Sequence, residues 1–189
     1  PYAPGSRRIS DLIVNVDHLI LMPIMKAITP DWGITGSIKL MQGVIQDPMS
    51  LHNELGRETE DNPNALIYKN QHIIGKTRLI VGDGLFGMWS GIHFPVQENG
   101  KSDVPDPWIT FSNGAPNSLF FSIDPVAVDS VMRDFVNNER SARGLGSLPA
   151  PQLVAGQAAG LGIFEEAPYS NIDYIEFELG EPPSPIHDC

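Results

Sequence analysis

Residues 77–84 have the sequence TRLIVGDG, and this stretch decides the fold class. Its apolar run is typical of a strand buried in a sheet, and the ending Gly82-Asp83-Gly84 predicts a turn. A second run, DHLILMP at residues 17–23, closes with a proline and predicts another strand, buried on both faces. Strands buried on both faces belong to parallel sheets covered by helices, so the two runs indicate an α/β protein.

Helical patterns lie between and after these runs. The clearest begins at Asp124, an expected N-cap, with Pro125 in the first helical position, and we predict that it ends near residue 138. Asp129 and Arg133 have the i, i+4 spacing of an ion pair on this helix. The other predicted helices cover residues 9–16, 36–46, 64–75 and 150–159.

Two segments, 108–111 and 117–123, alternate enough to be strands, and the turn sequence NGAP separates them. They predict a hairpin. Residues 172–179, IDYIEFEL, alternate with period two and predict a further strand with one wet face. The expected fold is therefore α/β, with a mostly parallel central sheet flanked by helices and an antiparallel hairpin at one edge. We expect one domain over residues 1–180 and an extended, proline-rich tail over residues 181–189.

Composition excludes several classes of function. The 189 residues include 12 Lys and Arg against 23 Asp and Glu, a net charge of −11. A nucleic-acid surface needs clustered basic residues, so nucleic acid is not an expected partner, and an anionic membrane surface is disfavoured for the same reason. No apolar run approaches the roughly 20 residues of a membrane-spanning helix. The single cysteine, Cys189, excludes an internal disulfide, a cysteine zinc site and a self-contained iron–sulfur cluster.

Polar residues near the ends of the two apolar runs are the candidate site. Ligands of open α/β sheets bind at the carboxyl ends of the strands. Lys26 follows the first run and could bind an anion, and Lys39 lies in an otherwise apolar stretch. Asp83 could act as a general base or a metal ligand, and Gly84 would let a ligand approach closely. Each has a structural alternative: a surface lysine, a snorkelling lysine, or an aspartate that caps its own turn.

His52 and Asp124 complete the set. His52 follows the break at Asp47-Pro48 and is the candidate acid or base. We predict His52 and Asp83 as catalytic residues, and Lys26, Lys39, Gly84 and Asp124 as ligands of a small anion. No pair of histidines has the spacing that fixes two metal ligands on one helix face. Whether the anion binds with or without a metal therefore stays open, and no cofactor can be named.

Four stretches in this order resemble a known family. They are VDHLILMPIMK (16–26), GITGSIKLMQGVI (33–45), RLIVGDGLFG (78–87) and SIDPVAVDSV (122–131). The matching residues are Thr35, Gly36, Lys39 and Gly43 in the second stretch and Asp124, Val126, Ala127 and Asp129 in the fourth. Together the stretches resemble the prokaryotic domain-of-unknown-function family 362.

The resemblance implies a mixed α/β domain, often exported to the periplasm or the cell exterior, whose activity is unassigned. Some members are fused to a cysteine-rich, ferredoxin-like module, whose cysteines this chain lacks. Family members carry a further α/β stretch before the first motif, where this chain has residues 1–15. A histidine common in the family is Ile28 here. We therefore expect a portion of the fold to be missing at the N-terminus.

Two main hypotheses follow. In the first, the domain is an enzyme or binding protein that takes a small anion, with or without a metal, at the strand ends. In the second, it is a non-catalytic subunit of a larger assembly, with a protein partner or an oligomer. The grounds are the N-terminal portion expected to be missing, the family's histidine replaced by Ile28, and the proline-rich tail. A third, an electron-transfer accessory, would need a cluster on a partner. The compartment stays open, with export suggested by the family resemblance alone.

Overall fold

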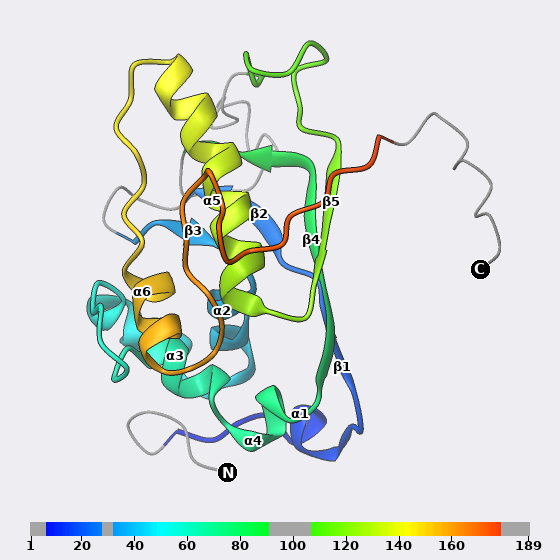
Figure 1. The fold of residues 1–189 in the computed structure, drawn as a ribbon. Coiled ribbons are helices and arrows are strands. Elements are labelled where there is room, and N and C mark those ends of the chain that lie inside the picture. The colour runs from blue at the N-terminus through cyan, green and yellow to red at the C-terminus, as the bar shows by residue number, and fades with distance from the viewer. Residues whose placement is uncertain (1–6, 28–31, 91–106, 179–189) are drawn as a thin grey trace, which may run out of the picture.

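The structure is a computed structural model, and it describes residues 7–27, 32–90 and 107–178. The strands form one curled sheet with helices packed against it (Figure 1). In chain order the elements are α1 (Asp11–Asn15), β1 (Leu19–Leu21), β2 (Ile24–Ala27), β3 (Ile34–Thr35), α2 (Ser37–Leu40), the 3-10 helices η2 (Met41–Val44) and η3 (Pro48–Glu54), α3 (Pro63–Tyr68), α4 (Gln71–Ile74), β4 (Thr77–Met88), β5 (Ser118–Ser122), α5 (Pro125–Ala142) and α6 (Pro151–Ala158).

Strand β4 is the centre of the sheet. β1 and then β2 run parallel along one of its edges, and Ile24 of β2 lies opposite Asp83. β5 runs antiparallel along the other edge, with Phe121 opposite Val81, and β3 is antiparallel to β2. The predicted fold class is confirmed: the protein is α/β, with a mostly parallel sheet flanked by helices and an antiparallel pair, β2–β3, at one edge.

Helices cover one face of the sheet. α5 crosses it, and α2, α3 and α6 lie on the same side (Figure 1). Successive side chains of a strand point to opposite faces. Ile80, Gly82 and Gly84 of β4 are buried on the side of α5, where a Cβ on Gly82 would come within 2.7 Å of Met132 Sδ. The apolar core therefore lies between β4 and α5.

Local sequence signals set the helix ends. Asp124 Oδ1 accepts hydrogen bonds of 2.8 Å from the backbone N–H groups of Val126 and Ala127, as predicted for an N-cap. The predicted helix over residues 64–75 is instead two helices, α3 and α4. Asn70 separates them, because its side chain accepts a hydrogen bond from His72 N and so caps a new helix.

The predicted hairpin of 108–111 with 117–123 is wrong. Residues 118–122 form β5, but the partner of β5 is β4. The backbone N–H groups of Ile109 and Thr110 donate instead to the carboxylate of Glu139 on α5, each at 2.9 Å. Because that buried carboxylate takes up these donors, residues 108–111 form no strand.

The extents of two predicted strands are also wrong. Residues 17–23 contain β1, but Ile20 and Met22 are 62% and 66% exposed, so the run is buried on one face only. Gly82-Asp83-Gly84 is not a turn. β4 continues to Met88, because β2 takes over from β1 as its parallel partner.

Two predictions near the C-terminus fail because other partners compete. Residues 172–178 form no strand, and Ile172 N donates to Glu165 at 3.1 Å. The predicted pair of Asp129 and Arg133 does not form; Arg133 donates to Leu148 O and to the Glu166 carboxylate.

The predicted tail, 181–189, lies outside the described residues. Within the described ranges, no helix has the length and apolar character needed to cross a bilayer.

Glu139 generates a test of this packing. Its side chain is fully buried; burial would raise its pKa, but hydrogen bonds from Ile109, Thr110 and Arg143 outweigh burial and lower the pKa to about 2. In Glu139→Gln, the side-chain N–H₂ group would face N–H donors that now donate to the carboxylate, and two donors cannot form a hydrogen bond with each other. We expect the free energy of unfolding at pH 7 to fall by about 2 kcal/mol, measured by urea denaturation.

The pH dependence has a definite sign. A folded-state pKa below the unfolded value stabilises the protein at neutral pH, and this contribution is lost as the pH falls from about 5 toward 2. The difference between wild type and Glu139→Gln should therefore narrow over that range. Glu60→Gln, at a largely exposed position, is the control and should stay within about 0.5 kcal/mol of wild type. Equal stabilities of wild type and Glu139→Gln at pH 7 would contradict the account.

Candidate functional site

The structure brings Lys26 and Lys39 together. Lys26 lies in β2 opposite Thr35 of β3 and opposite Met88 near the end of β4. Lys39 lies in α2, which begins two residues after Thr35. Both lysines are half-buried, and burial lowers the pKa of each; the charge of Lys26 lowers the pKa of Lys39 further. Two ammonium groups therefore interact near the carboxyl ends of β2 and β4.

Uncommitted hydrogen-bonding groups lie on the elements that carry these lysines. Residues opposite each other in an antiparallel pair point to the same face, so the side chains of Thr35 and Lys26 share a face. Within the described part of the chain, Thr35 Oγ1 is buried with no hydrogen-bond partner, and so is Gln42 Nε2, one helical turn after Lys39. Ammonium, hydroxyl and amide N–H groups all donate to anionic oxygens.

Asp129 of α5 fixes the helix that carries Lys39. It is fully buried, and its carboxylate accepts from Ser37 N at 2.7 Å, from Ser37 Oγ at 2.9 Å and from Ile38 N at 3.0 Å. These backbone N–H groups are the first two of α2, which no residue within the helix can satisfy. Burial raises the pKa of Asp129 to about 7, against the opposing effect of these hydrogen bonds.

Gly36 makes this contact geometrically possible. A Cβ at this position would lie 2.2 Å from Asp129 Oδ1, which no real side chain could tolerate. The carboxylate therefore reaches the start of α2 only across a residue without a side chain. Thr35 thus lies in the edge strand β3, Gly36 lies at the contact with Asp129 of α5, and Lys39 lies in α2.

Asp83 and Gly84 lie on opposite faces of β4. Asp83 is on the face away from α5, and its Oδ1 accepts from Leu85 N at 2.9 Å. The alternative expected from the sequence was an aspartate that caps its own turn; the hydrogen bond is local, but Asp83 lies within β4 and not in a turn. Gly84 is buried on the other face, where a Cβ would lie 2.7 Å from Phe120 and 3.3 Å from Met25. Core side chains, rather than a ligand, take the space beside Gly84.

Asp124 is fully engaged in the fold. Besides capping α5 with Oδ1, it accepts a hydrogen bond from Ile163 N through Oδ2 at 3.0 Å. A Cβ on Gly162 would lie 1.8 Å from this carboxylate. Asp124 therefore joins the start of α5 to the turn that follows α6, and the structure does not join it to the lysine pair.

His52 lies in η3, and its ring packs edge-on against Trp32, with centroids 5.2 Å apart. Its Nδ1 lies 3.0 Å from Met49 O, so the other ring nitrogen, Nε2, is the one left for proton transfer. Trp32 immediately precedes Gly33 and β3, and this places His52 on the side of the fold that carries Thr35. No hydrogen bond links His52 to either lysine among the described residues.

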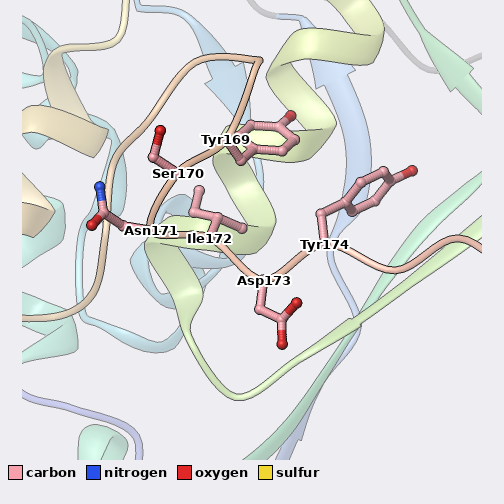
Figure 2. Close-up of a pocket in the computed structure, with 6 residues that line it drawn as sticks. All are labelled: Tyr169, Ser170, Asn171, Ile172, Asp173 and Tyr174. Carbon is pink, nitrogen blue, oxygen red and sulfur yellow. The ribbon is translucent and has the colours of Figure 1, made fainter.

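A surface pocket in the segment after α6 offers no alternative site. It is lined by the six consecutive residues from Tyr169 to Tyr174, and Figure 2 shows them as one folded loop beside α5. Two of its polar side chains already have partners: Tyr169 Oη donates to Asp134 at 2.8 Å, and Asn171 donates to Glu165. None of the predicted site residues lines it. Within the described ranges, no group of three or more His, Cys, Asp and Glu side chains could hold a metal ion.

The comparison with family models decides the assignment. The model of a family described as a domain of unknown function, DUF362, matches residues 4–134, more than half of the chain. The chain belongs to the DUF362 family. The predicted recognition is thereby confirmed. No curated protein and no solved structure matches the chain.

The DUF362 match covers the lysine pair and its support. Lys26, Thr35, Lys39 and Asp129 all lie within residues 4–134, as do His52 and Asp83, whereas α6 and the segment after it lie outside. Sequence reasoning did not assign Thr35 or Asp129 to the site. The sequence motifs did contain both residues. Thr35 precedes Lys39 by four residues in the motif Thr-Gly-x-x-Lys, and Asp129 is the last matching residue in the motif that begins with Asp124.

Gly36 gives the test of this DUF362 site. Gly36→Ala would force the new methyl group into the Asp129 carboxylate, so α2 or α5 must move. We expect a loss of about 2 kcal/mol or more in the free energy of unfolding, measured by urea denaturation. Gly43→Ala is the matched control, because a Cβ there meets no atom within 4 Å. Equal effects of the two substitutions would show that Asp129 does not hold α2.

Proposed function

We propose that this DUF362 domain binds a small, multiply charged anion, with phosphate or carboxylate groups, between Lys26 and Lys39. The observation that carries the proposal is a pair of half-buried lysines, of which Lys26 lowers the pKa of Lys39 by its charge, in a chain of net charge −11. Two like charges in a partly desolvated place repel each other. An anion between them would replace this repulsion with two charge-assisted hydrogen bonds.

The surroundings of the lysines support an oxygen-rich ligand. Thr35 Oγ1 and Gln42 Nε2 are buried donors without a partner among the described residues. A buried polar group without a partner costs about 1–3 kcal/mol, so a ligand or water that satisfies it is favoured. The position near the carboxyl ends of parallel strands is where ligands of open α/β sheets bind. The ligand-binding roles predicted for Gly84 and Asp124 are not part of this proposal, because both residues are engaged in packing or capping.

Binding, rather than a named reaction, is what these contacts favour. The predicted acid–base roles of His52 and Asp83 remain predictions. They would require a ligand that extends from the lysine pair toward Trp32 or across the edge of the sheet. The alternative, a non-catalytic subunit of a larger assembly, is favoured by a separate observation, the uncovered face of the sheet described below.

Calorimetric titration with inorganic pyrophosphate and with citrate tests the proposal. We expect wild type to bind at least one of them and Lys39→Ala to bind it at least about tenfold more weakly, equivalent to about 1.4 kcal/mol. Thr35→Val should cause a smaller loss. As the pH rises, the affinity should begin to decline before pH 10.5 is reached, because Lys39 has a lowered pKa and loses its charge at a lower pH than an ordinary lysine does.

Lys69→Ala is the matched control, since Lys69 is exposed and lies 4.0 Å from Glu60 at the edge of the fold. It should bind like wild type. The proposal is wrong if neither anion binds, or if Lys69→Ala weakens binding as much as Lys39→Ala does.

A further inference from the structure

The sheet face opposite α5 is apolar and exposed. Six large side chains from three strands and their ends share this face: Ile20, Met22, Ile24, Leu119, Phe121 and Ile123. Their exposed fractions run from 44% for Leu119 to 80% for Ile123. Leu79 and Val81 of β4 lie between them and are half-buried. We call this set the open face.

The open face departs from the usual design of such sheets. Sheets with parallel strands normally carry helices on both faces, because their strands are apolar on both sides. Here α2, α3, α5 and α6 lie on one side, and no helix of the described residues lies on the other (Figure 1). An exposed apolar patch of contiguous large side chains marks an interaction surface.

One charged residue lies inside the open face. The four nearest neighbours of Asp83 on this face are all apolar: Ile24 and Leu119 lie opposite it on β2 and β5, and Val81 and Leu85 lie two residues away along β4. Its Oδ1 accepts one hydrogen bond from Leu85 N, and within the described residues its Oδ2 accepts none. Covering this face would bury a carboxylate, which is costly unless a cation or donor meets it.

We propose that the open face docks a partner polypeptide through an amphipathic helix whose apolar surface carries a Lys or Arg opposite Asp83. The helix follows from the way parallel sheets are covered, and the basic residue follows from charge complementarity. A second copy of this chain is disfavoured as the occupant, because it would bring two Asp83 carboxylates and two chains of net charge −11 onto one interface. This inference does not depend on the anion site.

Two synthetic 18-residue amphipathic helical peptides are the probes. They have the same leucine-rich face and differ only in one residue at its centre, Lys or Glu. Binding is measured by fluorescence anisotropy at pH 7 and physiological salt. We expect the Lys peptide to bind wild type at least about fivefold more tightly than the Glu peptide. Asp83→Lys should reverse this preference, and Phe121→Ser should weaken both peptides.

Asp61→Lys is the matched control, because it makes the same charge reversal at an exposed position that is not on the open face. It should keep the wild-type preference. Three outcomes would overturn the proposal: neither peptide binds, Asp83→Lys leaves the preference unchanged, or sedimentation shows a wild-type dimer that Phe121→Ser dissociates. The last outcome would assign the open face to a second copy of the chain.

Discussion

The contact of the buried Asp129 carboxylate with the start of α2 is the constraint on which the site depends. It satisfies two backbone N–H groups that a helix cannot satisfy internally, and it does so from α5, the helix that packs on the sheet. One interaction thereby joins the sheet edge at β3, the helix that carries Lys39 and the main core helix. Gly36 allows the close approach, which explains why a glycine and an aspartate 93 positions apart act as one structural unit.

This constraint gives the lysine pair its chemistry. β2 holds Lys26 opposite Thr35, and Asp129 holds the start of α2, the helix that carries Lys39. Both lysines are half-buried, and the charge of Lys26 lowers the pKa of Lys39. The open face of the sheet is a separate feature, built from side chains of β1, β2, β4 and β5 that point away from α5. The proposed anion site thus uses two of the few positive charges of the chain, whereas the proposed docking surface uses exposed apolar side chains around Asp83.

Much of the fold could be predicted where the signal is local. The N-cap at Asp124, the proline after it and the apolar run at residues 77–84 determine their own elements. Failures came where a distant group competes. Glu139 takes the backbone donors of residues 108–111, which would otherwise suit a strand, and Glu165 takes that of Ile172. For the site, the sequence indicated Lys26 and Lys39, but the uses of Gly84 and Asp124 depend on Phe120 and Ile163, which only the tertiary fold brings to them.

The most direct measurement is an NMR titration of the Lys39 side-chain ammonium group, in wild type and in Lys26→Met. The account predicts a pKa for Lys39 below its ordinary value of 10.5 in wild type, because of burial and the nearby charge of Lys26. It predicts a partial rise in Lys26→Met, since the charge effect is removed and the burial effect remains. An ordinary pKa for Lys39 that is the same in both proteins would show that the lysines do not share a site.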